Sequence, residues 1–310
     1  MHRRYEYLIE RLAQSFPSTL PHARRCVGRE AEYPVVDQAT GMGADVRKVL
    51  RTMIERRRDA RGRPWLNPSQ DWDGDGPMVV TSDAGVVYTV EVGTSTVEIA
   101  HGPYPDLHAL RAGHEAAVAP VVEAAAALGA VLLGCGVQPK TEASAEIMTP
   151  KPHYAALHRA IGAPWLNFTV TASDQLHIDV RRDETILQTN LHNLLAPVII
   201  ALCGNSSIYA DASGDCCVRE TAMAPPPSGV DGIERYGMPR APFADFDDFV
   251  TTLAALPVLL LPGETDSIAD RRAECTGRTL RELYEAGAAG GDDRDEQWRH
   301  FMLHDHCALV

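Results

Sequence analysis

The stretch Val86–Pro103 alternates β-branched, apolar and polar residues, a pattern that predicts strand rather than helix. It places Glu91 and Glu98 inside an apolar run, where a desolvated carboxylate needs a binding partner. Strand geometry sends residues seven apart to opposite faces, but a bulge at Gly93 would return both carboxylates to one face. The alternative is a hairpin with two solvent-exposed glutamates.

Two further segments show strand periodicity with polar residues on one face. In the strand predicted to begin at Cys26, Glu30 and Glu32 are two residues apart and therefore share a face. The segment Thr169–Val180 alternates a polar row, Gln175, His177 and Asp179, with an apolar row, Leu176, Ile178 and Val180. Such a strand fits a sheet with its core on one side and a site on the other. A plain water-facing row is the alternative.

Apolar residues recur at helical spacing in residues 3–16, 106–129, 191–202 and 243–256, and four further helices are expected, of which the one at 45–60 is basic. The predicted helices cover residues 3–16, 45–60, 106–129, 154–161, 191–202, 243–256, 264–285 and 294–306. Asp106 is the expected N-cap of the third helix. A buried strand is expected at 130–138 and a loop at 61–77. The pattern predicts an α+β protein with one domain over residues 1–310, with a possible internal boundary in the loop at 223–242.

Composition narrows the function classes. The chain has 29 basic and 42 acidic residues, and a net charge of −13 argues against nucleic-acid or membrane-surface binding. The local basic run Arg47–Arg63 favours an exposed helix face. No apolar stretch is expected to span a membrane, and no signal peptide is visible. Seven cysteines without a CxxC motif predict reduced thiols in a cytoplasmic protein, with no redox motif around the adjacent Cys216 and Cys217.

Histidines offer two weaker candidates for a site. His114 lies on the apolar stripe of the helix at 106–129, which favours a histidine at the edge of the core over a ligand. A second group could hold zinc, but HExxH is absent and a helix with incidental histidines is favoured. This group consists of His300, His304, Asp305, His306 and Cys307.

Four short pieces stand in a recognisable order. They are G-R-E-A-E at 28–32, E-V-G-T-S-T-V-E-I at 91–99, Q-L-H-I-D-V at 175–180, and A-L-C-G-N-S-S at 201–207 followed by Arg219. In order and spacing they resemble the bacterial glutamate–cysteine ligase family, carboxylate–amine ligases related to glutamine synthetase. The resemblance covers roughly residues 26–224.

The resemblance implies a fold and a site. The fold would be a curved antiparallel sheet, a half-barrel backed by helices, as in the catalytic domain of glutamine synthetase. Mg²⁺ ions around the ATP phosphates would be held by Glu30, Glu32, Glu91, Glu98 and His177. Arg219 would contact phosphate or the substrate carboxylate, and Gln175 and Asn205 would bind ATP or substrate.

The activity implied is ATP-dependent amide formation between an amino-acid carboxylate and an amine, with glutamate and cysteine as the default pair. The chain departs from the pattern in two places, because no Glu-x-Arg strand follows His306 and His101-Gly-Pro replaces a Thr-Pro turn. The alternatives are therefore the same chemistry on other amino acids, or a weakly catalytic nucleotide-binding protein. A homo-oligomer could complete the site.

Overall fold

The fold is described from a computed structural model of the 310-residue chain. It describes residues 5–22, 24–56, 66–68, 72–73, 76–209, 212–213, 217–219, 239, 241–264, 270–274 and 276–308. Most of the loop predicted at 223–242 lies outside these residues, as does Cys216.

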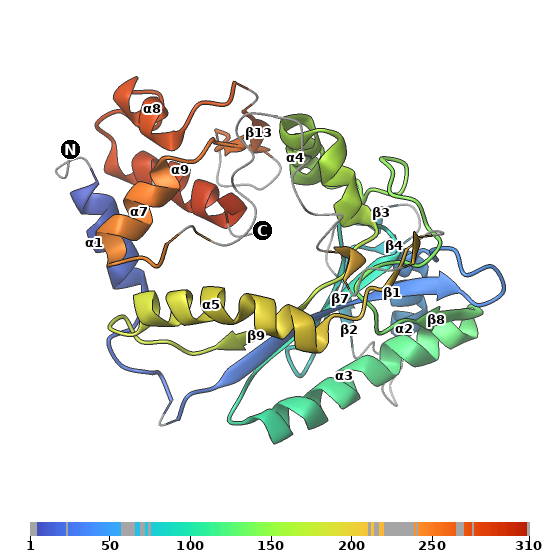
Figure 1. Ribbon diagram of the computed structural model, residues 1–310. Coiled ribbons are helices and arrows are strands. Elements are labelled where there is room, and N and C mark those ends of the chain that lie inside the picture. The colour runs from blue at the N-terminus through green and yellow to red at the C-terminus, as the bar shows by residue number, and fades with distance from the viewer. Residues whose placement is uncertain are drawn as a thin grey trace.

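A seven-stranded antiparallel sheet forms the centre of the molecule (Figure 1). Its order is β2-β5-β6-β7-β1-β8, and β9 also pairs with β1. The strands are β1 (Val27–Asp37), β2 (Leu66–Pro68), β5 (Val79–Ser82), β6 (Val87–Val90), β7 (Thr96–Tyr104), β8 (Ala130–Leu132) and β9 (Asp174–Ile178). The sheet stays open within the described residues, so the predicted α+β class is confirmed, while the likeness to glutamine synthetase stays a prediction.

Helices α2 (Val46–Arg56) and α3 (Leu107–Ala127) cover one face of the sheet. Asp106 caps α3 as predicted, since its carboxylate accepts the Ala109 N–H at 2.8 Å. The core between these layers is apolar and includes Val35, Leu50, Val97, Ile99 and Val121. Alternation along β1 and β7 then leaves the glutamates on the opposite face.

A second cluster joins the two ends of the described chain. Helix α1 (Glu6–Ser15) packs against α7 (Phe246–Ala254), α8 (Leu280–Glu285) and α9 (Arg294–Ala308), and Figure 1 shows these four helices side by side. A third cluster joins α4 (Pro152–Ile161) and the 3₁₀ helix η2 (Ala163–Thr169) to α9 through Leu303. Two-residue strands complete the structure: β3 (Trp72–Asp73), β4 (Gly76–Pro77), β10 (Ile208–Tyr209), β11 (Ala212–Ser213), β12 (Leu260–Leu261) and β13 (Arg272–Ala273).

Helix α5 (Thr185–Cys203) differs from the other helices because its apolar side chains are exposed. With 19 residues and a mean hydropathy of 1.5 in its most apolar window, it is long and apolar enough to cross a membrane by length and composition. The prediction that no stretch reaches this length was wrong, because the polar residues between the leucines are uncharged. The helix continues through Pro197.

Other boundaries also differ from the prediction. The segment 61–77 contains β2, β3 and β4 rather than only loop, and the strand predicted at 130–138 ends at Leu132. In β9 the apolar row is not in a core, since Leu176 is 53% exposed. The predicted helix at 264–285 is β13 followed by α8 in its described part. These segments are short and irregular, so tertiary contacts rather than periodicity decide their structure.

Candidate active site

Three neighbouring strands bring the predicted glutamates to one face of the sheet. Glu32 in β1 lies directly opposite Glu98 in β7, and Glu30 shares the face two residues earlier. Glu98 also lies opposite Thr89 in β6, and Glu91 follows two residues after Thr89. All four carboxylates therefore point to the same side. We call Glu30, Glu32, Glu91 and Glu98 the acidic face.

The route by which Glu91 joins the acidic face differs from the predicted bulge. The segment is a hairpin, in which the Glu91 N–H donates to the Thr96 carbonyl at 3.0 Å. Gly93 lies in the turn, where an added Cβ would be 1.8 Å from the Thr169 carbonyl oxygen. The hairpin alternative was right about the topology, but its glutamates are partly buried instead of fully exposed.

Burial and mutual repulsion raise the pKa of these carboxylates. Desolvation, reinforced by the charge of Glu91, raises the pKa of Glu32 to about 7. Desolvation and the other three glutamates raise the pKa of Glu98 to about 8. Burial likewise raises the pKa of Glu91. The face thus concentrates negative charge that a cation or protons must balance.

Hydrogen bonds fix the orientation of Glu32. Its two carboxylate oxygens accept from the backbone N–H and the hydroxyl of Ser173, each at 2.8 Å. The Gln175 amide donates to the same hydroxyl at 3.2 Å. Gln175 lies opposite Glu30 across the β1–β9 pair, and His177 Nε2 is 3.4 Å from Glu30 Oε2. The polar row of β9 therefore faces the acidic side, as predicted.

Two residues near the acidic face were not predicted from the sequence. Lys151 precedes α4, donates to the Val90 carbonyl at 2.8 Å, and its charge lowers the pKa of Glu91 and Glu98. Burial, with the charges of Glu91, Glu98 and Glu32, raises the pKa of Tyr154. Both residues come from the first turn of α4 or just before it.

The remaining predicted residues lie at different places. The charge of Arg219 acts to lower the pKa of Glu32, which indicates that this arginine lies near that carboxylate. Its backbone N–H donates to Ser206 Oγ at 3.2 Å. The Asn205 amide donates to the Gly134 backbone carbonyl at 2.7 Å.

The donor chemistry of the acidic face fits a hard divalent cation. As they stand, no three His, Cys, Asp or Glu side chains of the described residues are grouped to hold a metal ion. Glu30, Glu32, Glu91 and Glu98 nevertheless supply only oxygen donors, the type that Mg²⁺ prefers, and they raise one another's pKa.

Four buried histidines outside this face are His101, His114, His300 and His304. His114 is buried, as predicted, and its ring lies 2.8 Å from His101 and 2.5 Å from the Tyr33 hydroxyl. His304 Nε2 lies 2.7 Å from the Leu253 carbonyl, and His300 lies near Glu296. The described part of α9 thus uses its histidines in packing, while the side chains of His306 and Cys307 lie outside the description.

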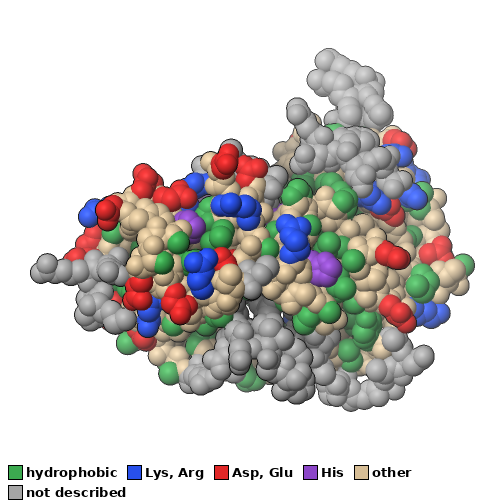
Figure 2. All heavy atoms as spheres, turned by 90° about the horizontal axis from the view of Figure 1, so that it is seen from above, with side chains coloured by type: hydrophobic (Ala, Val, Ile, Leu, Met, Phe, Trp, Pro, Cys, Tyr) green, Lys and Arg blue, Asp and Glu red, His purple; other side chains and the backbone are tan. Residues whose placement is uncertain are grey.

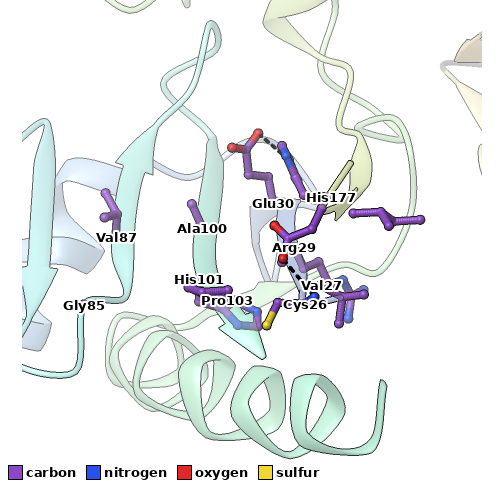
Figure 3. Close-up of a pocket in the computed structure, with 14 residues that line it drawn as sticks. Cys26, Val27, Arg29, Glu30, Gly85, Val87, Ala100, His101, Pro103 and His177 are labelled. Atoms are coloured by element: carbon purple, nitrogen blue, oxygen red, sulfur yellow. Dashed lines mark hydrogen bonds and ion pairs between the residues drawn. The ribbon is translucent and has the colours of Figure 1, made fainter. Parts of the chain in front are cut away.

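A hollow of about 510 Å³ adjoins the acidic face at the Glu30 end (Figure 3). We call it the Gly28 hollow; its lining includes Gly28, Glu30, Val87, Ala100, Gly102 and His177. In Figure 3 Val87, Ala100 and Glu30 point to the same side of the sheet. A pocket of this size is typical of small-molecule sites.

Comparison with known proteins places the chain among ligases. Residues 26–209 match glutamate-cysteine ligase family 2 (GCS2), a span that contains the acidic face, β9 and α5. The chain belongs to this family, which confirms the predicted resemblance. A search of curated proteins gives no match.

Proposed function

We propose that the chain is an ATP- and Mg²⁺-dependent carboxylate–amine ligase, with glutamate and cysteine as the default substrates. The observation that carries the proposal is the acidic face, where four carboxylates on one sheet face are coupled electrostatically in a family of glutamate–cysteine ligases. Their oxygens would hold Mg²⁺, with His177 beside Glu30 as a further ligand. When bound, Mg²⁺ would neutralise charge on the ATP phosphates.

The chain's own residues would order the two substrates around this charge. Lys151 and Arg219 supply the cations near the acidic face, and they would hold the substrate carboxylate close to the γ-phosphate. A carboxylate oxygen attacks the γ-phosphorus, and ADP leaves. The amine then attacks the acyl carbon, phosphate leaves with the acyl C–O bond broken, and the amine loses a proton to give the amide.

ADP release tests this function directly. Purified full-length chain, MgATP and glutamate are combined with a panel of amines that includes cysteine, and ADP and amide are measured. We expect ADP formation that requires Mg²⁺, the carboxylate and an amine together. Other amino acids replacing glutamate or cysteine would establish the same chemistry in a specialised pathway. Tight MgATP binding without turnover would support the nucleotide-binding alternative.

Partners and location follow from the same proposal. The partners are amino-acid substrates, in a cytoplasmic protein that could form a homo-oligomer. On the face that Figure 2 shows, acidic and basic side chains are interspersed. With a net charge of −13, this surface supports the proposal that the chain binds neither nucleic acid nor a membrane surface.

A further inference from the structure

We propose that Ser173 and Gln175 position Glu32 and thereby make the acidic face selective for Mg²⁺ over Ca²⁺. The inference rests on the proposed function, because it concerns the cation that the acidic face would hold. Ser173 and Gln175 act on that cation only through Glu32, so both are positioning residues. Three features carry the inference: hydrogen bonds to both oxygens of Glu32, a fixed direction of donation, and an anchor on the opposite face of the sheet.

Ser173 is joined to Glu32 by three hydrogen bonds. Its backbone N–H donates to Glu32 Oε2 and its hydroxyl donates to Glu32 Oε1, each at 2.8 Å. Its carbonyl in turn accepts the backbone N–H of Glu32, also at 2.8 Å. One residue thus holds the backbone and both carboxylate oxygens of Glu32. The carboxylate therefore cannot rotate without loss of at least one of these bonds.

The chemistry of the three groups fixes the direction of donation. An ionised carboxylate only accepts hydrogen bonds, and a serine hydroxyl has one proton, which Ser173 therefore gives to Glu32. The Gln175 amide nitrogen only donates, and it lies 3.2 Å from the same hydroxyl oxygen. Gln175 thus occupies a lone pair of the hydroxyl and leaves the proton for Glu32. In this account Gln175 acts on Glu32 through Ser173 rather than by contact with ATP or substrate.

An ion pair on the other face of the sheet anchors the same turn of the chain. Asp174 follows Ser173 and begins β9, and its two carboxylate oxygens accept from Arg29 Nε and Nη2 at 2.8 and 2.6 Å. Arg29 and Glu32 are three residues apart in β1, so their side chains lie on opposite faces. The start of β9 is therefore tied to β1 on both faces, and the bidentate pair adds geometric precision.

A ligand of fixed orientation favours Mg²⁺ over Ca²⁺. Mg²⁺ requires near-ideal octahedral geometry with oxygens at about 2.0–2.1 Å, whereas Ca²⁺ accepts about six to eight oxygens in flexible arrangements. Each Glu32 oxygen uses one lone pair for Ser173 and keeps another for a cation. Glu32 thus offers a cation a ligand of fixed direction. Loosening Glu32 should consequently weaken the binding of Mg²⁺ more than that of Ca²⁺.

The test measures the affinity for each metal alone, without nucleotide or turnover. Urea unfolding of the full chain at rising MgCl₂ or CaCl₂, at constant ionic strength, gives each Kd from the stabilisation that the metal causes. We expect Ser173→Ala to raise the Kd for Mg²⁺ at least about tenfold, the scale of a lost outer-shell partner, and the Kd for Ca²⁺ clearly less. Gln175→Met should act in the same direction by a smaller factor. Ser173→Thr, which keeps the hydroxyl, should restore the preference for Mg²⁺.

Ser82→Ala is the matched control. Ser82 also holds one residue through its backbone and its hydroxyl: its N–H donates to the Val86 carbonyl at 2.8 Å, and its hydroxyl accepts the Val86 N–H at 3.1 Å. Because no carboxylate takes part, Ser82→Ala should lower the metal-free stability and leave both Kd values unchanged.

The other outcomes overturn the inference in distinguishable ways. Unchanged Kd values in folded Ser173→Ala and Gln175→Met would remove the positioning role and leave the proposed function intact. Equal weakening of Mg²⁺ and Ca²⁺, or the same effect in Ser82→Ala, would show that Ser173 does not select the ion. If the wild-type chain binds neither metal, the cation site fails, and the proposed function fails with it. Circular dichroism establishes that each variant is folded.

Discussion

At the scale of single residues, Lys151 connects the start of α4 to the acidic face. Its ammonium group donates to the Val90 carbonyl and lies 5.1 Å from the centre of the Tyr154 ring. Its charge partly offsets the rise in the pKa of Glu91 and Glu98 that burial causes, and so favours the ionised carboxylates that a cation binds. Under the proposed function, Lys151 would hold the substrate carboxylate beside the bound Mg²⁺ without being a metal ligand itself.

Replacing Lys151 separates these two roles. In Lys151→Met we expect the KM for the carboxylate substrate to rise by at least about tenfold, the scale of a lost hydrogen bond to a charged group. Mg²⁺-dependent nucleotide affinity should fall much less, because Lys151 is not one of the proposed metal ligands. Lys140→Met is the control, since Lys140 also donates to a backbone carbonyl, that of Thr40 at 3.0 Å. An equal loss of nucleotide and carboxylate binding would contradict this assignment.

The sequence predicted the glutamates better than it predicted their neighbours. Glu30 and Glu32 share a face because strand alternation has a fixed period, and that much follows from two positions in the chain. Lys151 and Tyr154 reach the same face only because α4 packs on η2 and on α9, through contacts that no local pattern encodes. A single lysine before a proline carries no periodic signal, so its role required the tertiary structure.

At the scale of elements, the β6–β7 hairpin depends on how closely its turn passes the end of η2. A Cβ at Gly93 would also lie 2.7 Å from the Thr169 carbonyl carbon, so the neighbour is backbone and cannot rotate away. The same turn is bridged to Met148. The position of Glu91 is therefore set by a close approach between two segments of backbone.

Gly93→Ala should consequently destabilise the hairpin, although the substitution adds only one methyl group. We expect a destabilisation of about 1–3 kcal/mol, the usual range for overpacking, with a displaced turn and weaker Mg²⁺-dependent nucleotide binding. Denaturant unfolding measures the first effect and calorimetry the second. Gly134→Ala, with open space around its Cβ, should change neither quantity. A Gly93→Ala protein as stable as the wild type would show that the turn is not closely packed.

Elements with strong periodicity were predicted, and those defined by distant contacts were not. The spacing of apolar residues located α1, α3 and α7. For α5 it correctly predicted a helix with an apolar stripe, but periodicity does not say what a stripe packs against, and Leu194 is 72% exposed. The sequence does not distinguish a bulged strand from a hairpin at Val86–Pro103, because the alternation of apolar and polar residues is the same for both.

At the scale of the whole molecule, two of the three hydrophobic clusters are the larger ones. One lies between the sheet and helices α2 and α3, and the other joins α1 to α7, α8 and α9. The acidic face lies on the side of the sheet away from the first core, so its carboxylates are desolvated without being packed among apolar side chains of that core. Nothing in the local sequence pairs α1 with helices more than 200 residues later, which is why this architecture was not predicted.

The acidic face should make the stability of the metal-free protein depend on pH. The folded-state pKa values of Glu32 and Glu98, about 7 and about 8, lie above the ordinary value of 4.5 for glutamate. Between pH 4.5 and these folded-state pKa values, the folded protein therefore binds more protons than the unfolded chain. The stabilisation that comes from protonated Glu32 and Glu98 is complete below pH 4.5, and it is lost as the pH rises through about 7 and about 8. The slope is at most about 1.4 kcal/mol per pH unit for each carboxylate.

Urea unfolding from pH 6.5 to 8.5, with and without Mg²⁺, measures this dependence. The range avoids His114, whose pKa burial lowers to about 4 and which would destabilise the fold only as the pH falls below 6.5. We expect metal-free stability to fall with rising pH and Mg²⁺ to restore it most at pH 8.5, because the cation replaces the protons. Glu98→Gln should flatten the pH dependence and reduce the effect of Mg²⁺, whereas Glu115→Gln, on the exposed side of α3, should change neither. A free energy of unfolding that rises with pH and does not change with Mg²⁺ would show that these four carboxylates do not raise one another's pKa and do not bind a cation.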